Sequence, residues 1–299
     1  MTATLVTQRQ TSVRGFKNRF INGGFKIDTR NGFAAQSIGF GGSPAYCADR
    51  WIAYVAGSNE GSLVQGQCMG DGTYRFLAVT GTTLIDLAQR IESKNIKDLV
   101  GRVVTVSFDV SNTYKTTVYW EADYANSLDD FSSTTGAVSG QIDGVTSTLT
   151  RRNIQFTVPS GAVNGLQFYF YVTNQTYGYF TIGNVQLEDG PSMTDFEFRP
   201  HQLELLMCEY YARWVPFNIT FWAYAASEAL ECPILWSQMR VTPTIGSWVS
   251  DPAGTPAQTN VAGSGFVRIT PCGGAIYLQA AATGQCYALF YRTLMTAEL

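Results

Sequence analysis

Leu166-Gln-Phe-Tyr-Phe-Tyr-Val-Thr173 alternates strictly between apolar residues and glutamine, tyrosine or threonine. Successive side chains of a β-strand point to opposite faces, so Leu166, Phe168, Phe170 and Val172 would share one face. One buried face and one face in water is typical of antiparallel sheets that pack on a core. The stretch therefore predicts one strand of an antiparallel sandwich.

The same period of two extends on both sides of this stretch. It recurs in 103–110 and in 153–158, and again in 180–187. In the last segment the apolar phase switches at Gly183-Asn184, and a β-bulge would explain the switch. Residues 19–190 are therefore expected to form one sandwich domain.

The segment 82–93 fits two patterns. Leu84, Leu87, Ala88 and Ile91 would line one face of a helix, whereas Ile85, Leu87 and Ile91 would suit a strand. Periodicity alone leaves both structures open.

A linker and an amphipathic helix are expected over residues 191–214. Pro200 suits a helix start, and Glu204 and Arg213 would complement the helix dipole in the first and last turns. The apolar residues follow helical spacing and would pack between domains. They are Leu203, Leu206, Met207, Tyr210, Tyr211 and Trp214.

Residues 215–299 predict a smaller C-terminal β domain, because short aromatic strands alternate with turns rich in Gly, Pro and Thr. The expected strands are 217–225, 233–241, 266–270 and 287–295. The predicted fold is therefore all-β: an antiparallel jelly-roll sandwich, one linking amphipathic helix and a smaller C-terminal β domain.

Composition limits the function. The 299 residues carry a formal net charge of −3, so no strong positive field is available for nucleic acid. No apolar run approaches the roughly 18 residues of a membrane span, and residues 1–10 lack the apolar core of a secretory signal. Synthesis in the cytoplasm without membrane insertion is expected.

The six cysteines show no CxxC pair and hence no zinc-ribbon pattern. Cys208 is expected to be a small buried hydrophobic residue of the helix. Cys272 and Cys286 bracket a short segment that would fold back as a hairpin, so a bridge between them stays open.

Residues 1–18 are polar, with Arg9, Arg14 and Lys17 and no acidic residue before Asp28. Two interpretations remain for this leader: a frayed terminus, or an arm that attaches to an acidic or polar groove of another protein.

Several motifs occur in a fixed order along the chain. Glu204-Leu-Leu-Met-Cys-Glu-Tyr-Tyr211 resembles the Glu-Leu-x-x-Cys-x-x-Tyr-Tyr helix of phage tail-fibre and receptor-binding virion proteins, with the tyrosine pair one position early. Upstream and downstream segments resemble the same family. They are Asn18-Arg-Phe-Ile-Asn-Gly-Gly-Phe25, Tyr46-Cys-Ala-Asp-Arg-Trp51, Gln89-Arg-Ile-Glu92, 99–108 and Met239-Arg-Val-Thr-Pro-Thr244.

This resemblance covers most of residues 18–245 and implies a jelly-roll similar to the carbohydrate-binding modules of xylanases, with a strand over 82–93. It also implies a non-enzymatic virion protein, assembled in the host cytoplasm as a homotrimer. Such a short tail or collar fibre would attach by its N-terminus to other virion proteins of the tail, collar or capsid and contact the host surface. The alternatives are a decoration (cement) protein without a receptor role and a glycan-hydrolysing tailspike.

Catalytic chemistry has few candidates. His201 is the only histidine, so triads and His-rich metal sites would rest on it alone. Glu121 and Asp123 share one strand face at about 7 Å, and a glycosidase would need them to converge with Asp129 and Asp130. Solvated surface charges are the preferred interpretation, and no catalytic residue or cofactor is predicted.

The family resemblance also raises a structural calcium ion near the last strand of the sandwich. Asn184 occupies the position where a carboxylate is expected, and Asp28, Glu188 or Asp189 would have to substitute. No metal is therefore predicted.

Sugar or subunit binding is expected at outward-facing aromatic and carboxylate side chains. Trp120 belongs to the more apolar face of its strand and is expected in the core. The outward set either stacks on a glycan or packs against a neighbouring protomer, and contiguous aromatics favour the protomer. These candidates are Tyr119, Glu121, Asp123, Tyr169, Tyr171 and Tyr177.

Overall fold

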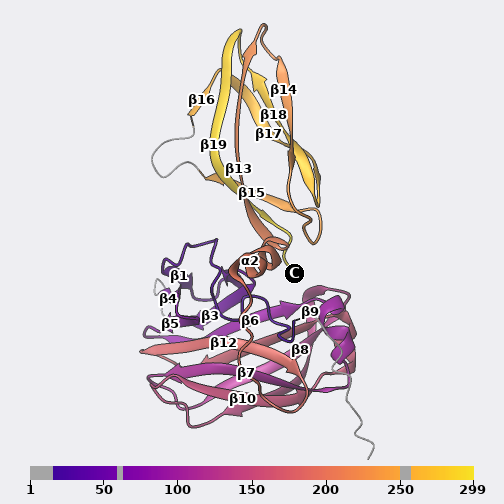
Figure 1. Ribbon diagram of the computed structural model, residues 1–299. Coiled ribbons are helices and arrows are strands. Elements are labelled where there is room, and N and C mark those ends of the chain that lie inside the picture. The colour runs from indigo at the N-terminus through magenta and orange to yellow at the C-terminus, as the bar shows by residue number, and fades with distance from the viewer. Residues whose placement is uncertain (1–15, 59–62, 250–256) are drawn as a thin grey trace, which may run out of the picture.

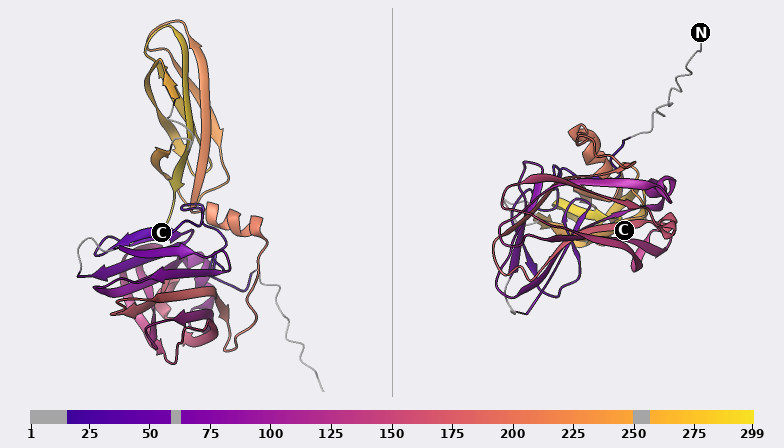
Figure 2. Two further views of the ribbon diagram at one scale, coloured as in Figure 1. Left: turned by 90° about the vertical axis from the view of Figure 1, so that its left-hand side faces the viewer. Right: turned by 90° about the horizontal axis from the view of Figure 1, so that it is seen from below.

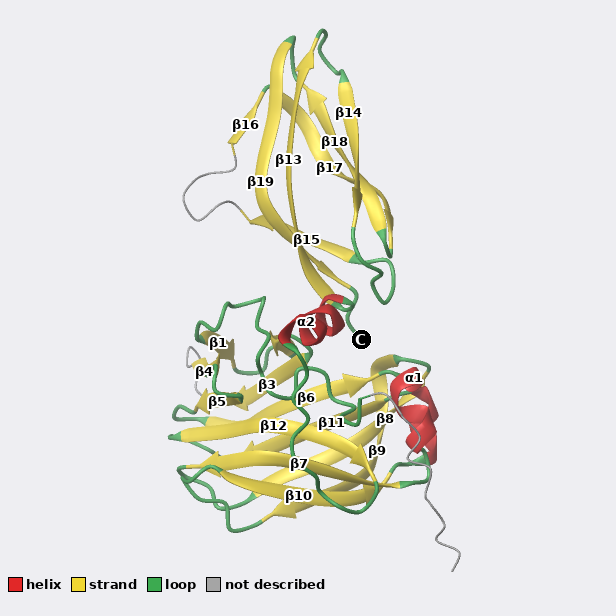
Figure 3. Ribbon diagram, in the orientation of Figure 1, coloured by secondary structure: helices red, strands yellow, loops and turns green. Residues whose placement is uncertain are grey.

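The computed structural model describes residues 16–58, 63–249 and 257–299. Two β domains stack end to end, and a single helix lies between them (Figure 1). Strands dominate both domains and the described helices are short (Figure 3). The all-β prediction is confirmed. No helix in these described segments is long and apolar enough to cross a membrane.

The N-terminal domain is a sandwich of two six-stranded antiparallel sheets. The first sheet has the order β1-β4-β5-β12-β7-β10, and the second has the order β2-β3-β6-β11-β8-β9. The strands of the first sheet are β1 (Gln36–Gly39), β4 (Leu63–Cys68), β5 (Thr73–Leu77), β12 (Tyr179–Asp189), β7 (Val103–Asn112) and β10 (Thr150–Thr157). The second contains β2 (Ala45–Ala48), β3 (Trp51–Gly57), β6 (Thr82–Ile91), β11 (Leu166–Thr173), β8 (Val118–Ser127) and β9 (Asp130–Ile142).

The alternation in sequence becomes the two faces of each sheet. In β11 every second residue is buried, and Phe168 and Phe170 are fully covered between the sheets. Phe168 contacts the rings of Phe20, Trp120 and Phe156 in one aromatic cluster. Each buried Phe contributes about 1.5–3 kcal/mol through removal of apolar surface from water. The expected core position of Trp120 is confirmed.

Two details expected from sequence are also confirmed. The ambiguous segment is strand β6, which pairs with β3 and β11 over its length. The register of β12 against β7 shifts between Gly183 and Gln186, which is the bulge predicted from the switch of apolar phase. Short helices follow β6 and precede β11: α1 (Ser93–Ile96), η1 (Lys97–Leu99) and η2 (Ser160–Asn164).

The linking helix is shorter than expected. Helix α2 runs from His201 to Glu209, and Trp214 lies in strand β13 (Ala212–Ala223). The side chain that α2 buries fully is Cys208, as expected, whereas Leu206 is 54% exposed. Cys208 and Tyr211 pack on Ile21 and Ile27 of the sandwich, with Met207 and Tyr210 at the margin. The predicted stripe was wrong in its extent, because α2 presents only a narrow strip to the sandwich. Leu203 stays half-buried.

The C-terminal domain has two sheets. One has the order β13-β19-β15 with β16 also paired to β19, and the other has the order β14-β18-β17. The further strands are β14 (Ala229–Leu235), β15 (Thr244–Val249), β16 (Ala257–Thr259), β17 (Val261–Thr270), β18 (Gly273–Ala280) and β19 (Gly284–Thr296). The smaller β domain is confirmed, but the expected strands missed β15, β16 and β18.

The hairpin expected between Cys272 and Cys286 is not formed, since β18 and β19 belong to different sheets. All six cysteines are free, with Cys272 exposed and Cys286 buried. A bridge between them is therefore absent from the structure.

The chain returns to the sandwich after β19, and the C label in Figure 1 lies at the junction of the two domains. Glu298 forms ion pairs with Arg30, at 2.6 Å, and with Arg50. The Arg50 side chain is 1% exposed and its guanidinium carbon lies 3.5 Å from the ring centre of Tyr211. We call Arg30, Arg50, Tyr211 and Glu298 the junction cluster.

Lys17, one of the three expected attachment residues, contacts the linker. Lys17 Nζ donates to Thr194 Oγ1 and to the carbonyl of Asp195, both at 2.6 Å, so residue 17 is already bound to the linker. Arg9 and Arg14, the other two expected attachment residues, lie outside the described residues.

Candidate functional site

The outward face of the second sheet collects aromatic and acidic side chains from its central strands. Tyr171 on β11 pairs with Tyr119 on β8 and with Asp86 on β6. Tyr169, two residues along, pairs with Glu121. Antiparallel register thus places these side chains on one surface, as β-sheet geometry requires. We call Asp86, Tyr119, Glu121, Asp123, Tyr169 and Tyr171 the acidic-aromatic face.

The tyrosines of this face pack on each other. The rings of Tyr119 and Tyr171 stack with centroids 5.1 Å apart and planes 18° from parallel, and Tyr169 lies 6.1 Å from Tyr171. All three are half-buried. A tyrosine in this arrangement offers a hydrophobic surface together with a hydroxyl.

Two carboxyl groups of the face each have one buried oxygen without a protein partner. Asp123 Oδ2 accepts a hydrogen bond from the Tyr169 hydroxyl at 3.2 Å, but its Oδ1 is buried without a partner. Asp86 Oδ1 is likewise buried and without a partner. A buried acceptor left unpaired costs about 1–3 kcal/mol. Gly136 on β9 leaves room beside Glu121 and Asp123, because a Cβ there would lie 2.9 Å from Glu121 Oε1 and 3.7 Å from Asp123 Oδ1.

These surroundings change how the acids titrate. Burial, followed by the negative charges of Asp123 and Glu121, raises the pKa of Asp86 to about 8. Burial and the neighbouring Glu121 also raise the pKa of Asp123. Burial and the two carboxylates Asp123 and Glu121 raise the pKa of the Tyr169 hydroxyl. Asp86 is therefore largely protonated near neutral pH.

The raised pKa of Asp86 predicts a pH-dependent stability. Unfolded Asp86 loses its proton near pH 4, whereas the folded side chain keeps it to about pH 8, so this group's contribution falls as pH rises between those values. Asp86→Asn should raise the free energy of unfolding at pH 8 by about 2 kcal/mol, because partial solvent access moderates the penalty. The gain should largely vanish at pH 4.

Urea denaturation at several pH values measures this gain. Asp143 is an exposed aspartate that accepts hydrogen bonds from Thr117 and Gln141, so Asp143→Asn serves as the control and should not stabilise at pH 8. Identical pH dependence in the wild type and Asp86→Asn would show that Asp86 titrates normally.

A cavity of about 170 Å³ adjoins the face between β3, β6 and β11. Tyr54, Asp86, Arg90 and Gln167 supply its polar lining. Arg90 is held in place, since its Nε donates to Gln167 Oε1 at 2.9 Å and a second nitrogen donates to the Leu299 carbonyl. The volume suits one sugar-sized group rather than a large cofactor.

Sequence reasoning missed Asp86, Tyr54 and Arg90 as site residues. Asp86 lies in the segment that fitted either a helix or a strand, and the strand reading places it opposite Ile85 and Leu87, on the outward face. That alternation was the available signal for Asp86.

Other candidates lie elsewhere. Tyr177 packs on Tyr114 in a loop at one end of the sandwich, with ring centres 4.0 Å apart. Asp129 accepts from the Ser93 amide at 2.6 Å, beside α1, and Asp130 is exposed. Asp129 and Asp130 lie at the turn between β8 and β9, whereas Glu121 and Asp123 lie further along β8, opposite Ser139 and Gly136.

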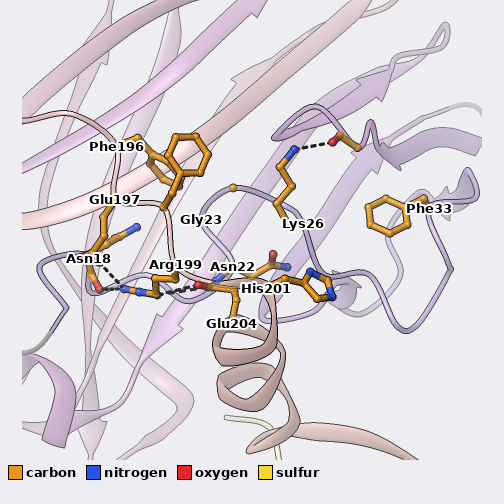
Figure 4. A pocket seen from close by; sticks show the side chains of 13 residues that line it. Asn18, Asn22, Gly23, Lys26, Phe33, Phe196, Glu197, Arg199, His201 and Glu204 are labelled. Carbon is orange, nitrogen blue, oxygen red and sulfur yellow. Dashed lines mark hydrogen bonds and ion pairs between the residues drawn. The ribbon is translucent and has the colours of Figure 1, made fainter.

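A second cavity, of about 350 Å³, lies between the first loop, the linker and the start of α2 (Figure 4). Arg199 crosses it, forming ion pairs with Glu197 and Glu204, each at 3.3 Å. Lys26 Nζ reaches the Gly70 carbonyl at 2.6 Å, and exposed His201 lies on its lining. Arg199 and Lys26 already have protein partners, so this cavity is the weaker candidate for a ligand.

The bulge of β12 is occupied by protein groups. Asn184 Nδ2 donates to Asp109 at 2.7 Å, and Arg151 pairs with the same carboxylate at 3.3 Å. Within the described segments no three His, Cys, Asp or Glu side chains are arranged to hold a metal ion. The proposed substitutes are engaged: Asp28 accepts from Asn31, Glu188 from Thr194, and Asp189 pairs with Arg102.

No protein-family model matches the chain, and no curated protein sequence matches it. Solved structures with a similar arrangement include one titled for the structure and function of CBM4, at 16% identity over 48% of this chain and 88% of that chain, with a TM-score of 0.36. A second is the enzymatically active domain of tailspike protein 4 from bacteriophage CBA120. It is 18% identical over 58% of this chain and 22% of that chain, with a TM-score of 0.36.

A third similar structure is a xylan-binding domain from Paenibacillus barcinonensis, at 16% identity over 60% of this chain and all of that one, with a TM-score of 0.32. Similarities at this level identify neither a ligand nor an activity. The sandwich is defined by the strand pairing of this chain itself.

Proposed function

We propose that the acidic-aromatic face binds a glycan, and that the protein is a non-enzymatic fibre or receptor-binding component of a phage virion. The observation that carries the glycan proposal is the group of acidic side chains, Asp86, Glu121 and Asp123, that lies beside stacked tyrosines on the outward face of the sheet. Sugar hydroxyls hydrogen-bond to carboxyl groups, and the apolar side of a sugar ring packs on aromatic rings. The ordered motifs from Asn18 to Thr244 support the virion role.

A subunit interface is the competing use of the face. Sequence alone favoured that interpretation because exposed aromatics are contiguous there. Charged groups are depleted from the centres of protein interfaces. A contact between two copies of this face would also bring carboxylates against carboxylates. The acid content therefore favours a hydroxyl-rich ligand over a second copy, and a trimer contact elsewhere on the molecule stays compatible with the proposal.

Tyr171→Ala is expected to weaken glycan binding about tenfold, because it removes the ring that stacks on Tyr119 and borders Asp86. Tyr171→Phe keeps the ring and should retain most of the affinity. Tyr177→Ala serves as the matched control, since it removes a tyrosine that is 58% exposed but lies away from the face.

The measurement is titration of full-length protein with surface polysaccharide purified from the host bacterium. The oligomeric mass of each variant is determined by light scattering. A change in mass on Tyr171→Ala with unchanged polysaccharide binding would assign the face to a subunit contact. Absence of binding by the wild type, at concentrations that saturate a multivalent adhesin, would favour the decoration role instead.

A further inference from the structure

The acidic-aromatic face carries acidic side chains without paired cations among the described residues, and its negative charge at neutral pH comes from Glu121 and Asp123, because Asp86 is largely protonated. Asp86, Glu121 and Asp123 lie on it, and in the described part of the chain none of these three forms a salt bridge with a cation. Arg90 lies at the margin, in the adjoining cavity, where Gln167 and the Leu299 carbonyl already take its hydrogen bonds.

Burial of the acidic side chains strengthens the effect of their charge on a nearby group. Asp123 is 7% exposed, and both Asp123 Oδ1 and Asp86 Oδ1 are shielded from water and lack a donor. Charges that are shielded from solvent interact over a longer range and are screened less by salt than exposed charges. An incoming anionic group would meet repulsion that water does not fully remove.

We infer that the face selects neutral, hydroxyl-rich glycans and discriminates against glycans that carry carboxylates, such as uronate or sialate polymers. This inference rests on the proposed glycan binding and adds the chemical class of the ligand. Hydroxyl groups can hydrogen-bond to the acidic side chains of the face without adding charge. A ligand carboxylate accepts hydrogen bonds but donates none, so it pairs with neither Glu121 nor Asp123 and adds a charge of the same sign.

The sharpest test uses polymers that differ only in charge. Polygalacturonate and hyaluronate can each be carboxyl-reduced, which converts every uronate into the corresponding neutral hexose without changing the linkage. The acidic surface polysaccharide of the host, where it has one, can be treated in the same way. Binding of the full-length protein to each pair is measured by affinity electrophoresis and calorimetry at 20 mM and at 300 mM salt.

For each pair that binds, we expect the carboxyl-reduced polymer to bind at least about tenfold more tightly than its acidic parent at low salt. The ratio of the two dissociation constants should fall towards one at 300 mM salt, because screening weakens the repulsion. It should also narrow in the triple variant Asp86→Asn, Glu121→Gln, Asp123→Asn, whose side chains keep nearly the same shape. Addition of EDTA should leave the ratio unchanged.

Each outcome is distinguishable. Equal or tighter binding of the acidic parents, weakened by Tyr171→Ala, would overturn the neutral-glycan inference while the glycan-binding face stands. A ratio that persists in the triple variant would place the discrimination at other residues and overturn the inference as well. Failure of the wild type to bind every polymer, the host polysaccharide included, would contradict the glycan-binding proposal itself. Near-UV circular dichroism checks that the triple variant is folded.

Discussion

Glu298→Ala is expected to lower the free energy of unfolding by about 3–5 kcal/mol, because it leaves a buried arginine without its counter-charge. The Arg50 side chain is 1% exposed and packs against the ring of Tyr211, so water cannot replace the lost carboxylate. Among the described residues, Arg30 then keeps Asp49, at 3.9 Å, as its acidic partner. The loss should affect the junction of the two domains first.

The matched control is Glu231→Ala. Glu231 also forms an ion pair with an arginine, Arg268, but the two side chains are 40% and 74% exposed. An exposed pair of this kind is worth about 0–1 kcal/mol. Urea denaturation of both variants measures the contrast, and limited proteolysis reports opening of the junction. Losses of equal size in the two variants would show that burial of the junction cluster does not strengthen its ion pairs.

Gly23→Ala is expected to cost about 3 kcal/mol or more, because a side chain cannot fit where the first loop meets strand β12. A Cβ on Gly23 would lie 2.1 Å from the carbonyl oxygen of Val185, which is backbone and cannot rotate away. The loop and β12 are joined here by the hydrogen bond from the Val185 amide to the Gly23 carbonyl, at 2.8 Å. Separating them would also release the Asn18 side chain from Val185.

The adjacent glycine supplies the control. A Cβ on Gly24 would lie 3.4 Å from the ring of Phe196, which is an ordinary contact, so Gly24→Ala should cost less than about 1 kcal/mol. Thermal unfolding of the two variants gives the comparison. A Gly23→Ala protein as stable as Gly24→Ala would mean that the loop shifts away from β12 without loss.

The sequence predicts the fold well where one face of a strand is buried and the other is exposed to solvent. The alternation in 166–173 specified β11 because its apolar residues fill the space between two sheets. The helix was less readable. Tyr211 and Trp214 continue helical spacing from Leu203, yet Trp214 belongs to β13, where its indole nitrogen donates to the Thr29 carbonyl at 2.8 Å. Trp214 is held in β13 by its pairing with β19 and by this long-range hydrogen bond, and neither is visible in the local sequence pattern.

The sequence predicts only part of the site, because the register between strands is not visible in it. Tyr119, Glu121, Asp123, Tyr169 and Tyr171 come from two strands whose outward faces were evident from alternation. Asp86 joins them only because β6 pairs with β11 in one register. Register between strands is set by the whole sheet, so the missing donors at Asp86 and Asp123 could be seen only in three dimensions.

The junction cluster also determines how freely the distal domain can move. The C-terminal domain is joined to the sandwich covalently at α2 and β13, and by a second, ionic attachment after β19 (Figure 2). One attachment would act as a swivel, whereas two attachments leave at most a rocking motion about the line that joins them. The tip of the distal domain would then keep a nearly constant direction relative to the acidic-aromatic face. In an assembly with several copies, fixed directions let all copies reach a flat surface at once, which a swivel would not ensure.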